Sequence, residues 1–322
     1  MSEQKPVLVS GVKPTGDLHI GNYFGAMRQF VELQEKYRSY VFIADYHALT
    51  TSHSQRHPDE VRASIRHIAL GYLAIGFDPT KVVFFQQSHI PAHTELAWIF
   101  NCLTTMPYLM RAHAYKDAEA KSEEISVGTF DYPMLMAADI LLYDPAVVPV
   151  GKDQKQHVEF ARDTAQKFNS LYGDTFAVPE PYILPEVAVV PGTDGQKMSK
   201  SYGNVIPLFA PRDELARAVM SIVTDSSGDR PQNVYAIHKL VRSEQELEKM
   251  YDEHRGNYKM LKELLIEDLD RYLAPMRAKY EELKSDPGIV EEVLESGKHE
   301  ARAISEAKME AVRKAVGVTS QY

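Results

Sequence analysis

The stretch VLVSGVKPTGDLHIGN, residues 7–22, decides the fold. Its first residues form a short apolar run that is typical of a buried strand, and Gly11 with the segment 13–16 indicates a turn. An apolar-patterned helix is expected from about Asn22 to Tyr37. A strand that turns into a helix in this way builds open α/β sheets, which bind phosphates at such helix entries.

Further strand and helix patterns alternate through the first half of the chain. Apolar runs predict strands at 40–45, 81–86 and 147–150. Between them, Pro58 opens a predicted helix whose apolar residues recur at spacings of three and four, and Gly76 stands at its stop position. Short apolar strands separated by helices predict a doubly wound α/β fold with a Rossmann-like parallel sheet.

The second half of the chain changes character after about Tyr202, where strand patterns end and charge density rises. Leucines, tyrosines and a methionine at helical spacing from Leu261 to Leu283 predict a helix–helix packing seam, and Pro275 inside it predicts a kink. A final helix is expected at about 288–316. We therefore expect a catalytic domain at 1–205 and an all-helical domain at 206–322, whose last helix could pack back toward the first domain.

Composition sets the outer bounds on function. Hydrophobic residues make up 44% and charged residues 25% of the 322 residues, as in ordinary globular proteins. There is one cysteine, no apolar run of membrane-spanning length and no secretory signal pattern, so we expect a soluble cytoplasmic protein. The net charge of −9 argues against binding nucleic acid over the whole surface but leaves room for a local basic groove.

The helix entry carries the first candidate chemistry. His19 and Asn22 are three residues apart, so both can face the same side, and Gly21 lets a flat ring or a phosphate approach the backbone. The alternative is an ordinary glycine turn, which is common.

A second cluster, KMSKS at 197–201, follows the glycine-containing segment 191–195. The ammonium groups of Lys197 and Lys200 suit a polyphosphate whose charge grows as a bond breaks. The alternative is a solvated basic loop. Occurrence of both clusters in one chain favours the functional interpretation.

HIGN at 19–22 together with KMSKS resembles the paired signatures of class I aminoacyl-tRNA synthetases. The segment DYPMLMAADILLYDPAVVPVGKDQKQHVEFARD at 131–163 is similar to the same region of bacterial-type tryptophanyl-tRNA synthetases, and the similarity extends over nearly the whole chain. The resemblance implies ATP-dependent activation of tryptophan, with Mg²⁺ bound through the ATP phosphates, and transfer to tRNA(Trp). It also implies a homodimer and an anticodon-binding helical domain.

Specificity for tryptophan has a physical argument of its own. Tyr132, Met136 and Asp139 share one face of an apolar helix, and an aromatic ring, a thioether and one acceptor suit an indole. A buried Asp139 could instead pair with an arginine or cap a neighbouring helix, and the residues alone favour that alternative. The resemblance reverses the preference, because bacterial members use this Asp to accept the indole N–H.

The expected site residues follow, most of them from the resemblance. The catalytic residues are His19, Asn22, Lys197 and Lys200. ATP is expected to contact Lys13, Pro14, Thr15, Gly21, Asn22, Gly151, Lys152, Asp153, Val190, Lys197, Met198, Ser199, Lys200 and Ser201. Tryptophan is expected to contact Ser10, Tyr132, Met136, Asp139 and Gln154. No protein-bound metal is expected. His47, His89, His93, His113 and His157 are interpreted as polar or packing residues, with His157 behind the site.

The chain departs from the family pattern at a few positions. Lys13 stands where many members have Gln, Lys152 where many have Glu, and Val9 replaces a larger residue. Three alternatives remain. The Asp139 helix argues against a tyrosyl-tRNA synthetase, and the KMSKS segment argues against a small nucleotidyltransferase. The intact signatures argue against a non-catalytic paralogue.

Overall fold

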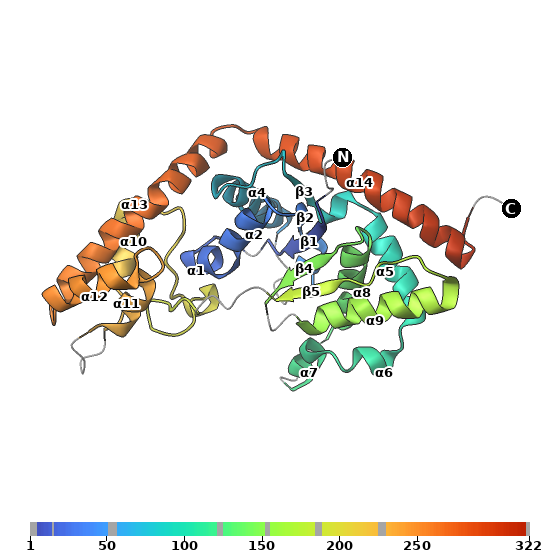
Figure 1. Cartoon of the computed structure of the whole chain (residues 1–322), viewed down its shortest axis with the longest axis horizontal. Coiled ribbons are helices and arrows are strands. Elements are labelled where there is room, and N and C mark those ends of the chain that lie inside the picture. Colours follow the sequence, from blue (N-terminus) through green and yellow to red (C-terminus); the bar gives the residue numbers. More distant parts are fainter. Residues whose placement is uncertain are drawn as a thin grey trace.

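The computed structural model describes residues 5–14, 16–50, 57–120, 125–151, 155–183, 189–224 and 230–319. At its centre lies a five-stranded sheet in the order β3-β2-β1-β4-β5 (Figure 1). The strands are β1 (Val7–Val12), β2 (Arg38–Ile43), β3 (Val82–Gln86), β4 (Val147–Val150) and β5 (Glu180–Ile183). Every neighbouring pair is parallel, which confirms the predicted doubly wound α/β fold.

Helices cover both faces of this sheet, so its central strands are apolar on both sides. Along β2, Tyr40 and Phe42 belong to one buried cluster, whereas Val41 and Ile43 belong to the other. In the first half the helices are α1 (Ile20–Asn22), α2 (Arg28–Leu33), α3 (Asp45–Ala48), α4 (Pro58–Ala74), α5 (Ala92–Leu103), α6 (Met106–Leu109), α7 (His113–Ala120), α8 (Val127–Leu141) and α9 (Lys155–Tyr172). In the second half they are α10 (Arg212–Met220), α11 (Gln232–His238), α12 (Glu244–Glu253), α13 (Tyr258–Lys284) and α14 (Ile289–Val316).

Element boundaries differ from the sequence-based expectation in three places. The helix expected over 22–37 is divided by a π-helical turn, Tyr23–Met27, and ends at Leu33. The strand expected to reach Asp45 ends at Ile43, because Asp45 opens α3. The strand β5 was not predicted, because the sequence EPYI has no long apolar run and contains a proline, which an edge strand tolerates.

The last helix, α14, crosses the sheet at its β3 edge and lies above it in Figure 1. Its first turns pack into one apolar cluster through Val290 and Leu294, and its later turns enter the other through Ala301 and Met309. A β-carbon at Gly297 would lie 1.9 Å from the Phe84 carbonyl oxygen, so only glycine permits this approach. The helix thereby covers an edge strand that would otherwise be open to pairing with other chains.

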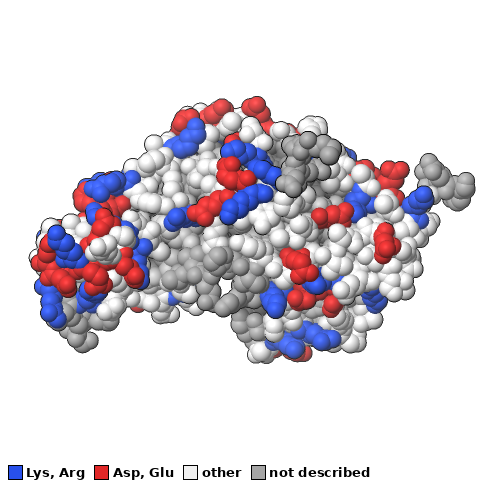
Figure 2. All heavy atoms as spheres, viewed as in Figure 1, with Lys and Arg blue, Asp and Glu red and all other residues white. Residues whose placement is uncertain are grey.

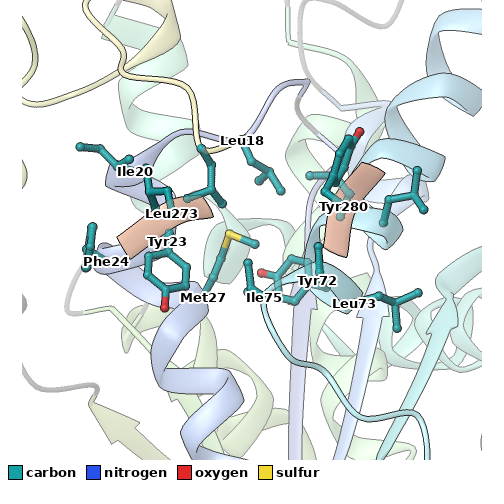
Figure 3. Close-up of a cluster of buried hydrophobic side chains, with 14 of the residues drawn as sticks. Leu18, Ile20, Tyr23, Phe24, Met27, Tyr72, Leu73, Ile75, Leu273 and Tyr280 are labelled. Carbon is teal, nitrogen blue, oxygen red and sulfur yellow. The ribbon is translucent and has the colours of Figure 1, made fainter. Parts of the chain in front are cut away.

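The helices α10 to α13 gather at one end of the molecule (Figure 1). α13 runs unbroken through Pro275, and the predicted kink there stays a prediction. Its apolar face joins the cluster that also contains the HIGN region and α4, part of which is drawn in Figure 3. None of the described helices has the length and apolar composition that a membrane crossing would need.

Candidate active site

The strand order reverses between β1 and β4, and ligands of open α/β sheets bind in the crevice at that point, outside the carboxyl ends of the strands. Lys13 follows β1 directly and Gly151 follows β4. Ser10 is buried within β1, and Pro14 is buried in the turn after it. Lys13 as a whole is exposed, and desolvation of its ammonium group by the surrounding protein lowers its pKa. Thr15 and the segment 152–154, with Lys152, Asp153 and Gln154, lie outside the described residues.

His19 and Asn22 form a reciprocal cap at the start of α1. The Asn22 backbone N–H donates to His19 Nδ1 at 3.3 Å, and the His19 backbone N–H donates to Asn22 Oδ1 at 3.1 Å. This pairing satisfies two donors that a helix start leaves open, and it fixes the imidazole over the helix entry. The spacing of three residues thus has a local structural cause as well as the proposed functional one.

The protonation state of His19 follows from its surroundings. Burial, and then the neighbouring Lys200 ammonium, lower the pKa of His19 to about 4. The ring is therefore neutral at pH 7, and because Nδ1 accepts a hydrogen bond, Nε2 carries the proton. Such a ring presents a donor for a phosphate oxygen without adding a charge of its own.

The KMSKS segment lies directly against the HIGN segment. A β-carbon at Gly21 would lie 3.2 Å from Met198 Cβ, and one at Gly16 would lie 2.8 Å from Lys200 Nζ. The Met198 backbone N–H donates to the Val190 carbonyl at 2.9 Å, so Val190 borders the same segment. Two motifs almost 180 residues apart in the chain are thus brought together beside the β1 turn.

Asn204 organises the KMSKS loop, and the sequence analysis missed it. Its side chain is 2% exposed. Asn204 Oδ1 accepts the Ser199 N–H at 2.8 Å, and Nδ2 donates to Asp194 Oδ1 at 2.6 Å and to the Lys197 carbonyl at 3.1 Å. The amide therefore holds both ends of the loop while Lys197 stays exposed. Ser199 and Ser201 join their hydroxyl groups at 2.9 Å. An asparagine a few residues after the motif was the available signal.

Asp139 is the centre of a buried polar cluster on α8. Its Oδ1 lies 2.8 Å from Gln87 Nε2 and 2.6 Å from His93 Nδ1, and its Oδ2 lies 2.7 Å from His47 Nε2. Burial raises the pKa of this carboxyl, but the imidazoles of His47 and His93 outweigh that effect and hold the pKa at about 2. The partners are therefore neither an arginine nor a helix end, the two alternatives that the sequence suggested.

Among the residues that the structure describes, three hydrogen bonds to the Asp139 side chain are present. An ionised carboxylate accepts about four hydrogen bonds, and the described partners occupy three of these positions. The remaining position is on Oδ2, next to His47, whose ring packs edge-on against Tyr132 at 6.2 Å between centroids. Met136 lies between Tyr132 and Asp139 on α8, and both Met136 and Tyr132 are partly exposed. An acceptor beside an aromatic ring and a thioether can receive an N–H on an apolar ring.

His47, Gln87 and His93 were not among the expected site residues, and the interpretation of His47 and His93 as polar or packing residues did not include their hydrogen bonds to Asp139. His47 lies in α3, just after β2, and Gln87 directly follows β3. Polar residues that follow adjacent parallel strands meet at one edge of the sheet, and that rule was the available signal. His157, which was placed behind the site, lies 2.7 Å from the Tyr132 hydroxyl.

Comparison with known proteins identifies the family of the chain. The family described as tRNA synthetases class I (W and Y) matches residues 1–285. The chain belongs to this family. The tryptophan–tRNA ligase of Fusobacterium nucleatum subsp. nucleatum is 46% identical over 319 residues, which cover 96% of this chain and 97% of that protein. The tryptophan–tRNA ligase of Campylobacter jejuni (strain RM1221) is 44% identical over 320 residues, 97% of this chain and 99% of its own length.

A solved structure extends the comparison to three dimensions. The crystal structure of tryptophanyl-tRNA synthetase from Campylobacter jejuni complexed with ADP and tryptophan is similar with a TM-score of 0.89 and 43% identity. The match covers 97% of this chain and 99% of that chain. Among the described residues of this chain, no three His, Cys, Asp or Glu side chains are grouped to hold a metal ion.

Proposed function

We propose that the chain is a tryptophan–tRNA ligase that activates L-tryptophan with ATP and then transfers it to tRNA(Trp). The observation that carries the activation step is the contact between the two signature segments at the β1 turn, Met198 against Gly21 and Lys200 against Gly16. The identity of the amino acid is supported by tryptophan–tRNA ligases that are 44–46% identical over nearly the full chain. A cytoplasmic location is part of the proposal.

The first step needs no general base, because the tryptophan carboxylate is already ionised at neutral pH. One of its oxygens attacks the α-phosphorus of ATP in line, and the bond to the departing pyrophosphate breaks. Catalysis then rests on positioning and on stabilising the charge of the leaving group. Neutral His19 donates from Nε2 to a phosphate oxygen, and Lys197 and Lys200 accompany the pyrophosphate together with an ATP-bound Mg²⁺. A tyrosyl-tRNA synthetase, which would activate tyrosine by the same reaction, is the alternative to this function.

ATP–pyrophosphate exchange against each standard amino acid tests the proposal. Stimulation by tryptophan alone is expected; stimulation by tyrosine would favour the tyrosyl enzyme, and none at all a non-catalytic paralogue. Lys200→Ala should depress the exchange rate far more than tryptophan affinity, because the ammonium acts on the leaving group. An equal loss in both would contradict that role.

We propose that residues 206–322 hold the helices that bind the tRNA anticodon and that residues 1–205 bind ATP and tryptophan. Charged side chains of both signs gather over α10 to α13 in Figure 2 and are interspersed rather than separated. Arg230, for example, pairs with Glu248 at 2.7 Å. Recognition of tRNA is therefore expected to use a local set of basic groups. Lys249→Glu, at an exposed position on α12, should lower charging of tRNA(Trp) transcripts and leave tryptophan-dependent pyrophosphate exchange unchanged.

A homodimer is also part of the proposal, and three exposed apolar side chains support it. Trp98 on α5 is 71% exposed, Met106 on α6 62% and Val127 on α8 80%. Their helices α5 and α6 both pack against α8, and exposed apolar side chains that lie together are typical of interaction sites on soluble proteins. Analytical ultracentrifugation should give a dimer for the wild type and a monomer for Trp98→Glu. A monomeric wild type would contradict the dimer, and a dimeric variant would place the interface elsewhere.

A further inference from the structure

We propose that His67 is a positioning residue that holds the backbone of the HIGN entry against α13. The inference rests on the proposed function, because the segment that it positions is the candidate phosphate-binding one. His67 lies on α4, outside both signature motifs, and its side chain is 22% exposed.

The imidazole of His67 bridges two parts of the molecule with its two ring nitrogens. Nε2 accepts the Leu18 backbone N–H at 3.3 Å, one residue before His19. Nδ1 lies 2.6 Å from the Tyr280 hydroxyl on α13. Because Nε2 must be an acceptor, the neutral ring carries its proton on Nδ1 and donates to Tyr280.

Two further contacts hold Leu18, one to its side chain and one to its carbonyl oxygen. One turn beyond His67 on the same face of α4, a β-carbon at Gly71 would lie 2.2 Å from Leu18 Cδ1, so the leucine side chain packs tightly onto the helix. The Leu18 carbonyl accepts the Leu208 N–H at 2.9 Å. The position of His19 thus depends on α4 through a backbone hydrogen bond and a side-chain contact.

The contacts close into a ring that includes the segment after KMSKS. The Ile20 N–H donates to the Ile206 carbonyl at 3.0 Å, and Phe209 stacks on Tyr280 with ring centroids 4.4 Å apart. Tyr280 then returns to His67, and Figure 3 shows Leu18 and Tyr280 in the same cluster. The His67 imidazole is therefore one member of a ring of contacts that joins the HIGN segment, the segment after KMSKS and α13.

The bridge requires a neutral ring. If Nε2 were protonated, it would become a donor and could no longer accept the Leu18 N–H, so the hydrogen bond between Leu18 and His67 would be lost. The charged groups that act on the ring are Asp17 from the turn, Lys200 from the KMSKS loop and Lys284 from α13. Burial and the two ammonium groups lower the pKa of His67 against the opposing effect of Asp17. The bridge is therefore intact at neutral pH and opens as the pH falls below the ordinary histidine range.

Two isosteric substitutions separate the two hydrogen bonds. His67→Gln keeps an acceptor near the position of Nε2, whereas His67→Asn keeps a donor near Nδ1 and leaves the Leu18 N–H without a partner. Tyr280→Phe removes the hydroxyl but keeps the ring on Phe209. His299→Asn on α14 is the matched control, since that side chain is exposed.

The measurements are tryptophan-dependent ATP–pyrophosphate exchange from pH 5 to 8 and amide hydrogen exchange of the peptide that contains residues 17–22. We expect His67→Asn to lower kcat about tenfold with an unchanged tryptophan KM, and to speed amide exchange at Leu18. The kcat of His67→Gln should stay within about threefold of the wild-type value at neutral pH. Because glutamine does not titrate, this variant should lose the part of the decrease in kcat at low pH that protonation of His67 causes.

Equal kcat values for the Asn and Gln variants, or an unchanged acid limb in His67→Gln, would overturn the proposal. If His67→Asn fails to fold, two other measurements decide in its place. An unchanged acid limb in His67→Gln, or an unchanged kcat in Tyr280→Phe, would then overturn the proposal. If the wild type shows no exchange with tryptophan, the proposed function fails. Hydrogen exchange at Leu18 then still tests whether His67 holds the amide.

Discussion

Replacing Asp139 by Asn tests the proposed indole recognition with a change of one atom. The substitution removes the charge and turns one oxygen of the carboxylate into a donor group. The Oδ1 partners Gln87 and His93 can keep an oxygen acceptor, whereas the group beside His47 becomes an NH₂. That is the side on which the fourth acceptor position lies, so an indole N–H would face another donor.

The structure gives the magnitudes. Hydrogen bonds to charged groups contribute about 1.5–3 kcal/mol, so tryptophan affinity should fall about 10- to 150-fold. Stability should fall as well, because pairing lowers the pKa of Asp139 from its ordinary 3.8 to about 2. A lower pKa in the folded state means that the ionised, paired carboxylate stabilises the fold, by an amount on the order of 2 kcal/mol. Because the folded-state pKa is the lower one, this contribution is present above pH 3.8 and is lost as the pH falls toward 2.

Calorimetric titration with tryptophan and with an analogue in which sulfur replaces the indole N–H provides the assay. The wild type should bind tryptophan more tightly than the analogue, and Asp139→Asn should bind the two with similar affinity. Urea unfolding at pH 7 measures the loss of stability separately. If the variant keeps the full preference for tryptophan, Asp139 does not accept the indole N–H.

Three further predictions follow from contacts away from the amino-acid pocket. Gly297→Ala should destabilise the fold by about 1–3 kcal/mol in urea, because the new β-carbon meets the Phe84 carbonyl; Gly288→Ala, with a nearest neighbour at 3.6 Å, is the control. Asn204→Asp should lower kcat for pyrophosphate exchange about tenfold or more, since a carboxylate would face Asp194 and the Lys197 carbonyl; unchanged kinetics would contradict a role in shaping the loop. Glu95→Gln should cost less than about 1 kcal/mol, because its pair with Arg313 on α14 is partly exposed and screened; a larger loss in thermal denaturation would contradict that reasoning.

The sequence by itself determined four strands of the sheet and the pairing of His19 with Asn22 on one side of the helix entry. Apolar runs at β1 to β4 are readable because a strand buried on both faces must be continuously apolar, and only β5, with its proline, escaped. The cap at His19 and Asn22 is equally local, since both residues lie within one helical turn. Such features depend on neighbours in the chain, and a single sequence shows them.

Only the tertiary structure decided how distant groups meet. His47 and His93 reach Asp139 across 92 and 46 positions of the chain, and His67 reaches Tyr280 across 213. His47 could be singled out by its position after β2, but no local pattern distinguishes His67 and His93 from histidines at the surface, because their partners are supplied by other elements. A buried carboxylate needs hydrogen-bond partners, and the sequence indicated that need at Asp139. The packing of α3, α5 and α8 in the folded chain determines that His47 and His93 are those partners.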